Sequence, residues 1–224
     1  ADHTIKTLNF LRSVASRGGH VNWDEVIVKG TSTSLLKDYY RLNALPDPTT
    51  VRPEIILTEA VKNFKKKHAL EEPSAKLYSF LNNQYKAIRQ DLRVQHVKNE
   101  FVVDVYETHA RICLEYEDIP EVNQCQTQLH ELYNLGICST NDGELQSELQ
   151  TSGSVGTLGN IGEFTAYRIL YNVYISCKYK HGASAMHEIL HDAYERGVST
   201  DSAVVHALSV RESVEMDDYH SFFH

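Results

Sequence analysis

The longest uninterrupted helical pattern in the sequence runs from Gln84 to Gly136, and it restricts the fold more than any other stretch. From Val97 onward, apolar residues recur at three- and four-residue spacings, and charged residues fill many of the remaining positions. So wide an apolar face is difficult to bury against one neighbour, and we expect this helix to pack against partners on two sides. The apolar positions are Phe101, Val102, Val105, Tyr106, Ile112, Cys113 and Tyr116.

A short turn divides this stretch into two helices. Pro120 cannot continue the first helix but suits the first turn of the second, and Asp118 is the expected side-chain cap. Gly136 is placed to end the second helix in a left-handed conformation. The pattern therefore predicts a hairpin of two helices, the unit from which helical solenoids are assembled.

Similar periodic runs fill most of the remaining chain and predict an all-α fold. A repeated ending supports a tetratricopeptide-like solenoid of helical pairs, because Tyr133 and Tyr194 each precede a glycine by three residues. Between these pairs, the segment 138–161 is rich in small and polar residues and is expected to be a flexible loop. Prolines should hold the segment 46–53 extended. Further helices are predicted over 1–15, 31–45, 53–69, 73–92, 163–179, 183–196 and 201–211, with another beginning near residue 216.

Composition excludes several classes of protein. The net charge of -8 argues against a surface covered in nucleic-acid-binding charge, so any nucleic-acid contact must be local. The four cysteines show no CxxC spacing, which favours reduced thiols over a disulfide framework. The sequence contains neither a signal-peptide pattern nor an apolar run of transmembrane length, so we expect a soluble intracellular protein with no membrane partner.

Two groups of basic residues could form a local nucleic-acid contact. Such a surface would bind phosphates with an affinity that falls as the salt concentration rises. The alternative is a solvated helix face with no ligand. The candidate residues are Lys62, Lys65, Lys66 and Lys67 in one predicted helix, and Arg89, Arg93 and Lys98 further along the chain.

One string has the form of a catalytic metal motif. His187, Glu188 and His191 match the H-E-x-x-H pattern, in which two histidines on one helical face bind zinc and the glutamate acts as a base. Tyr194 stands where one zinc-protease class has glycine, and the flanking apolar residues suit a packed helix. We therefore expect no catalytic residue, metal or cofactor, and zinc hydrolysis remains a remote alternative.

Ordered blocks of sequence stand out at 29–31, 38–42, 46–48, 51–53, 88–92, 95–96, 99–101, 105–111, 123–126, 163–170 and 206–211. Together these blocks resemble the SAC/GANP family of PCI-associated scaffold proteins. The resemblance extends from about Val28 to the end of the sequence. It is closest to the branch that includes the yeast Thp-type elongation and splicing factor and the mammalian leukocyte-receptor-cluster homologue.

The resemblance implies that residues 28–224 are the helical arm of a PCI module, without its winged helix, preceded by an N-terminal helix and linker over 1–27. It further implies a nuclear, non-catalytic scaffold that couples transcription to mRNA processing, splicing or export. Expected partners are a second PCI-domain protein, a small acidic Sem/Dss-type subunit, and RNA or DNA bound weakly and jointly with that partner. A direct RNA-binding module is the main alternative.

Overall fold

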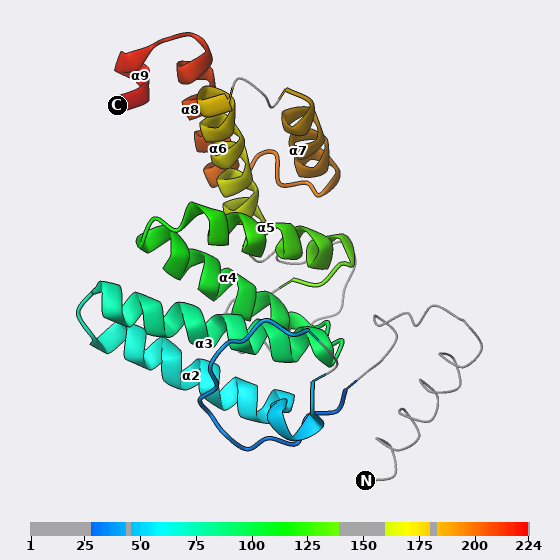
Figure 1. Ribbon diagram of the computed structural model, residues 1–224. Helices are drawn as coiled ribbons and strands as arrows, with labels where there is room; N and C mark the ends of the chain where they lie inside the picture. The colour runs from blue at the N-terminus through cyan, green and yellow to red at the C-terminus, as the bar shows by residue number, and fades with distance from the viewer. Residues whose placement is uncertain (1–27, 44–45, 139–159, 180–182, 224) are drawn as a thin grey trace, which may run out of the picture. The chain divides into compact units, whose positions relative to one another are not determined.

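The computed structural model describes residues 28–43, 46–138, 160–179 and 183–223, and Figure 1 shows their arrangement as helices. Across these residues all regular secondary structure is helical and no strand is present, which confirms the all-α prediction. Neighbouring helices pack in pairs, as in a helical solenoid. The chain divides into two compact units, Ala1–Val97 and Lys98–His224, which are described separately. The elements are η2 (Pro48–Thr50), α2 (Glu54–Leu70), α3 (Ala75–Val94), α4 (Glu100–Glu115), α5 (Ile119–Asn134), α6 (Ile161–Tyr179), α7 (Ala183–Glu195), α8 (Ser202–Glu215) and α9 (Tyr219–Phe223).

The first unit is built on the hairpin of α2 and α3, whose predicted boundaries are correct to within two residues. Pro53 precedes α2, and the Ser74 side chain caps α3 by accepting a hydrogen bond from the Leu77 amide. The core between the two helices is aromatic. The Phe64 ring meets Phe80 edge-on, with centroids 5.8 Å apart, and lies 6.3 Å from the ring of Tyr85.

Residues 28–43, which we call the strap, contain no helix, so the helix predicted over 31–45 is wrong in its described part. Side chains of α3 bind the backbone of the strap in place of intrahelical hydrogen bonds. The amides of Lys37 and Tyr39 donate to Gln84 Oε1 (3.1 Å) and Asn83 Oδ1 (2.8 Å). Gln90 Nε2 donates to the Tyr40 carbonyl at 2.8 Å. These tertiary contacts override the local helical pattern.

The N-terminal end of the strap is fixed by Gly30 and Gln95. The Gly30 amide donates to Gln95 Oε1, while Gln95 Nε2 donates to the Arg52 carbonyl at 2.8 Å. A Cβ atom at Gly30 would lie only 2.4 Å from the Val51 carbonyl oxygen, so a larger residue would displace the backbone. The segment 46–53, predicted to be extended throughout, also contains the short turn η2, which the Asp47 side chain caps.

A buried charge cluster joins the strap to α3. Arg52 and Asp91 are both inaccessible to solvent, and Arg52 Nε lies 2.7 Å from Asp91 Oδ2. Lys37 of the strap pairs with the other carboxylate oxygen of Asp91. Arg52 Nη1 also donates to the Leu35 carbonyl at 3.0 Å. Two cations thus compensate one buried carboxylate, which suits a group that would be costly to bury alone.

The second unit begins with the hairpin of α4 and α5, as the sequence predicts. The Asn99 side chain caps α4, and the Asp118 side chain caps α5 by accepting from the Glu121 amide at 3.2 Å. Gly136 has a φ of 75° and Gly197 a φ of 70°, so both repeated endings do close in the left-handed region. The local sequence signals therefore determine this hairpin and the end of α7.

Helices α6, α7 and α8 share an apolar cluster, with α6 packed against both of the others. Most of its side chains are small or branched, which permits close helix packing. No helix in the described ranges is long and apolar enough to cross a membrane. The predicted helix over 1–15 and most of the predicted loop over 138–161 lie outside the described residues. The cluster consists of Ala166, Ile169, Met186, Ile189, Val204 and Ala207.

Candidate interaction sites

The predicted basic residues are distributed over both units. In α2, Lys62 and Lys66 are exposed and Lys65 is half-buried, and their spacing places all three on one side of the helix. Lys67 pairs with Glu71 and lies 5.3 Å above the Phe80 ring. In the other group, Arg89 and Arg93 are one turn apart on α3, whereas Lys98 is exposed in the second unit.

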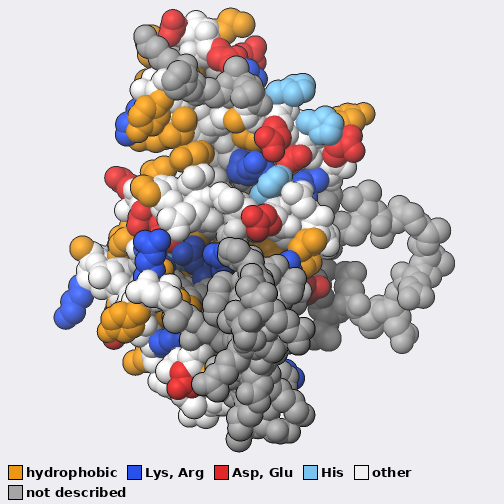
Figure 2. Space-filling view, turned by 45° about the vertical axis from the view of Figure 1, so that its right-hand side comes forward, with side chains coloured by type: hydrophobic (Ala, Val, Ile, Leu, Met, Phe, Trp, Pro, Cys, Tyr) orange, Lys and Arg blue, Asp and Glu red, His pale blue; other side chains and the backbone are white. Residues whose placement is uncertain are grey.

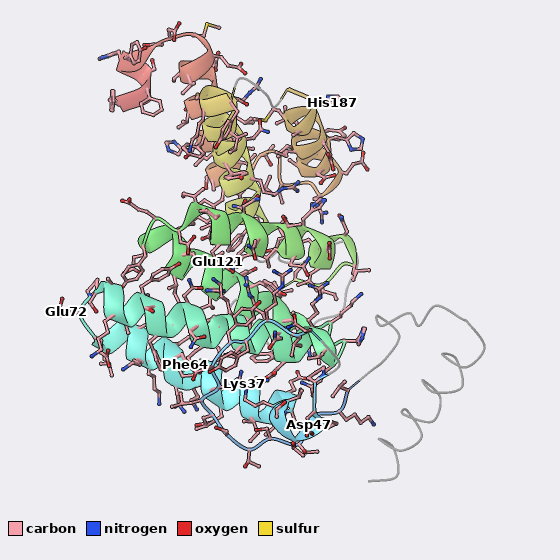
Figure 3. All side chains as sticks on the ribbon, in the orientation of Figure 1. Lys37, Asp47, Phe64, Glu72, Glu121 and His187 are labelled. Atoms are coloured by element: carbon pink, nitrogen blue, oxygen red, sulfur yellow. The ribbon has the colours of Figure 1, made fainter. Side chains whose placement is uncertain are left out.

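The histidines of the H-E-x-x-H string are on the solvent side of α7. His187, Glu188 and His191 are all exposed, and Figure 3 labels His187 on that helix. In the described parts of the chain, these three do not belong to any group of His, Cys, Asp and Glu with metal-binding spacing. Among the residues that the structure describes, the geometry therefore offers no third protein ligand for a catalytic zinc ion at this position.

A different set of residues has the spacing of metal ligands. His109 on α4 and Glu121 and Cys125 on α5 are buried, and one ligand atom from each lies within 4.8 Å of the others. His109 Nδ1 and Cys125 Sγ are 3.7 Å apart, a distance that also suits a weak hydrogen bond to sulfur. The sequence analysis did not identify this cluster, because its members come from two helices with no ligand motif.

A small pocket lies among α5, α6 and α7, and its wall combines apolar side chains with charged ones. On the charged side, Arg168 Nη1 lies 2.7 Å from His130 Nδ1, so the guanidinium donates and the imidazole accepts. Asp192 Oδ2 is 3.6 Å from Arg168 Nη1 and 3.4 Å from His130 Nδ1. Arg196 donates to Asn134 Oδ1 at the end of α5. The lining residues are Gln126, Leu129, His130, Tyr133, Ile161, Phe164, Thr165, Arg168, Ile189, Asp192 and Arg196.

Burial dominates the electrostatics of this pocket, in which Arg168, Arg196 and His130 lie beside Asp192. Burial and then the charge of Arg168 lower the pKa of His130 below its usual value, although Asp192 acts in the opposite direction. Burial also lowers the pKa of Arg168 itself, against the opposing charges of Asp192 and Glu188. Asp192 and Glu188 thus oppose the effect of burial on the pKa values of both His130 and Arg168.

A network of hydrogen bonds from α4 supports the far wall of the pocket. Glu107 is buried and accepts hydrogen bonds from the Tyr133 hydroxyl at 2.8 Å and from Asn160 Nδ2 at 2.6 Å. Burial, together with the charge and hydrogen bond of Glu107, strongly raises the pKa of Tyr133. Next to it, Arg111 binds Glu163 of α6 with two hydrogen bonds. This network fixes α6 against the α4–α5 hairpin.

Comparison with known proteins identifies the family. The model of the SAC3/GANP family matches residues 24–224. The chain belongs to the SAC3/GANP family. It is 42% identical over 204 residues to a THP3 homolog of Schizosaccharomyces pombe, a match that covers 91% of this chain and 44% of that protein.

Two further SAC3/GANP-related matches agree with the predicted branch. The chain is 39% identical over 208 residues to the Leukocyte receptor cluster member 8 homolog of Xenopus laevis, covering 93% of this chain and 22% of that protein. It is 37% identical over 123 residues to Protein THP3 of Saccharomyces cerevisiae, covering 55% of this chain and 25% of that protein. The chain thus spans less than half the length of each of these relatives.

Proposed function

We propose that this SAC3/GANP chain is the helical arm of a non-catalytic scaffold subunit in a nuclear PCI-type complex that couples transcription to mRNA processing, splicing or export. Its partners in this proposal are a second PCI-domain protein and a small acidic Sem/Dss-type subunit, with RNA or DNA bound jointly. The observation that carries the proposal is the family match over residues 24–224. The described helical pairs support it, because stacked pairs provide extended binding surfaces.

The proposal is tested by reconstitution with a defined partner. The purified, tagged chain would be added to nuclear extract and recovered together with the proteins bound to it. Any PCI-domain protein found in this way would then be expressed and mixed with the chain at known concentration. We expect the two to elute together from a sizing column at equal stoichiometry, and the acidic subunit to join only when the PCI partner is present. A chain that stays monomeric with every recovered PCI protein would contradict the scaffold function.

Direct RNA binding is the second candidate, and the lysine face of α2 is the observation that favours it. Lys62, Lys65 and Lys66 share one side of the helix, so they could contact successive phosphates. With a net charge of -8, however, the chain can attract a polyanion only through such local faces. Nanomolar, sequence-selective RNA binding by the purified chain alone would favour this candidate over the scaffold.

A further inference from the structure

We propose that the pocket among α5, α6 and α7 binds the carboxylate of an acidic side chain from a partner's segment. The site lies entirely within the second unit, so its geometry depends only on helices that pack together there. At the height of these helices, Figure 2 shows Arg or Lys side chains beside histidines and carboxylates. The inference rests on the proposed scaffold function for the existence of a partner, but the pocket itself can be tested separately.

The charged wall of the pocket is rich in hydrogen-bond donors. The guanidinium groups of Arg168 and Arg196 each carry five N–H groups. Arg168 donates to His130 and lies near Asp192, while Arg196 donates to Asn134. His130 Nδ1 accepts a hydrogen bond from Arg168, so this nitrogen is not available to accept another. A ligand that supplies acceptor oxygens therefore complements this wall better than one that supplies donors.

Gln126 is an independent indication of a ligand. Its side chain is only 3% exposed and lines the pocket, yet its Nε2 is buried without a hydrogen-bond partner in the described structure. Leaving a buried N–H group without an acceptor costs free energy, and native proteins rarely do so. A carboxylate oxygen in the pocket would accept from Gln126 while its charge is compensated by the two arginines.

Asp192 limits which anion fits. Its Oδ2 is also buried without a well-formed hydrogen bond, and its negative charge lies on the same wall as Arg168. A singly charged carboxylate meets less repulsion from Asp192 than a doubly charged phosphate does. The pocket is also small and partly lined by Leu129, Phe164 and Ile189, so it suits a small planar carboxylate better than a phosphate. We therefore assign it to an acidic peptide.

The test uses the full chain and two capped peptides, one rich in glutamate and the other with every glutamate replaced by glutamine. Binding would be measured by calorimetry at fixed ionic strength, and NMR would follow the side-chain amide of Gln126. We expect the glutamate peptide to bind at least about tenfold more tightly, because charge-assisted hydrogen bonds are stronger than neutral ones. The Gln126 signal should shift only with the glutamate peptide. Equal binding of both peptides, or an unmoved Gln126 signal, would overturn the assignment.

Four variants locate the interaction and separate it from folding. Arg196→Gln should weaken binding about tenfold, whereas the matched variant Arg211→Gln, on α8 and outside the pocket wall, should not change it. Gln126→Leu removes the buried donor at similar volume and should also weaken binding. Asp192→Asn should strengthen it, because one repelling charge is removed; weaker binding would overturn the proposal.

Two further measurements identify the anion and separate the pocket from the scaffold function. A phosphoserine peptide that binds more tightly than the glutamate peptide would reject the carboxylate in favour of phosphate. Reconstitution with the PCI partner provides the separate readout on the scaffold function. A chain that forms that complex but discriminates neither peptide disproves the pocket alone. A chain that binds the glutamate peptide but forms no complex disproves the scaffold function alone.

Discussion

Arg111 on α4 forms a bidentate ion pair with Glu163 on α6, donating from Nε to Oε1 at 2.9 Å and from Nη2 to Oε2 at 2.6 Å. The Tyr167 hydroxyl donates to the same Oε1 at 3.0 Å, and the guanidinium carbon lies 5.2 Å above the Phe164 ring. This two-point contact connects residues 52 positions apart in sequence. It therefore orients α6, one of the three helices around the pocket.

Removing the charge of Glu163 should destabilise the second unit. We expect Glu163→Gln to lower the free energy of unfolding by about 1–2 kcal/mol, because one charge-assisted hydrogen bond is lost while the packing is kept. Urea unfolding followed by circular dichroism would measure the change. Glu195→Gln, at an exposed position of α7, is the matched control and should have little effect. Equal stability of the two variants would show that the contact does not contribute.

The same pair gives a prediction about pH. Burial alone would raise the pKa of Glu163, but the hydrogen bonds and charge of Arg111, with a hydrogen bond from Tyr167, lower the pKa below its ordinary value of 4.5. A lowered folded-state pKa stabilises the protein above the unfolded-state pKa, and this contribution is lost as pH falls through the folded-state value. The difference in stability between wild type and Glu163→Gln should thus be largest near neutral pH and shrink as pH falls below 4.5. If the difference in stability between the two proteins increased at acidic pH, the predicted direction of the pKa shift would be wrong.

Asp91 should be among the most sensitive positions in the first unit. Replacing it with asparagine leaves Arg52 buried without its counter-charge, and breaking a buried pair in this way costs about 3–5 kcal/mol. Glu59→Gln, on the exposed side of α2, should change stability little. Chemical unfolding of the variants would provide the comparison. A loss as small as that of the control would mean that Lys37 and Arg52 reach water readily.

Charge reversal tests the lysine face of α2. We expect the intact chain alone to bind single-stranded RNA weakly, with Kd on the order of 10⁻⁴ to 10⁻⁶ M at physiological salt, and the affinity to fall as salt rises. Reversing Lys62, Lys65 and Lys66 to glutamate should remove most of this binding without unfolding α2, whereas Lys76→Glu should have a small effect. Fluorescence anisotropy at several salt concentrations would distinguish them. If the charge reversal leaves the affinity for RNA unchanged, this face contacts only solvent and is not an RNA-binding surface.

Metal analysis tests the histidine motif. Protein purified without added zinc should contain far less than one zinc ion per chain, since His187 and His191 are exposed without a third ligand of suitable spacing among the described residues. The double variant His187→Ala with His191→Ala should leave the zinc content unchanged. Stoichiometric zinc that survives this change but disappears in Cys125→Ser would place the ion in the buried cluster with His109 instead.

The sequence predicted those elements whose signals are local. Asp118, Pro120 and Gly136 act within a few residues of their positions, so the boundaries of α5 follow from them. The strap could not be predicted in this way, because its partners are remote: the Tyr39 amide bonds to Asn83, 44 residues away. An apolar spacing that suited a helix was thus outweighed by side-chain amides supplied from α3.

The pocket among α5, α6 and α7 was missed for a related reason. Gln126 and His130 lie one helical turn apart, as do Asp192 and Arg196, so each pair shares a helix face. Periodicity shows that these faces exist, but it does not show that they meet one another and Arg168. The basic residues of α2 were accessible to sequence reasoning because they are consecutive, whereas their role as a nucleic-acid contact stays a prediction.

Because Lys37 pairs with Asp91, the strap contacts the α2–α3 hairpin much as a separate bound peptide would. A hairpin produced without the strap would retain Arg52 but lose one of the two cations that face its buried carboxylate. A synthetic strap peptide added in trans would have to restore that cation, and replacing Lys37 in the peptide with methionine should abolish rescue. The equilibrium constant for docking of the strap in the intact chain, divided by the association constant of the separate peptide, would give the effective concentration that covalent linkage provides.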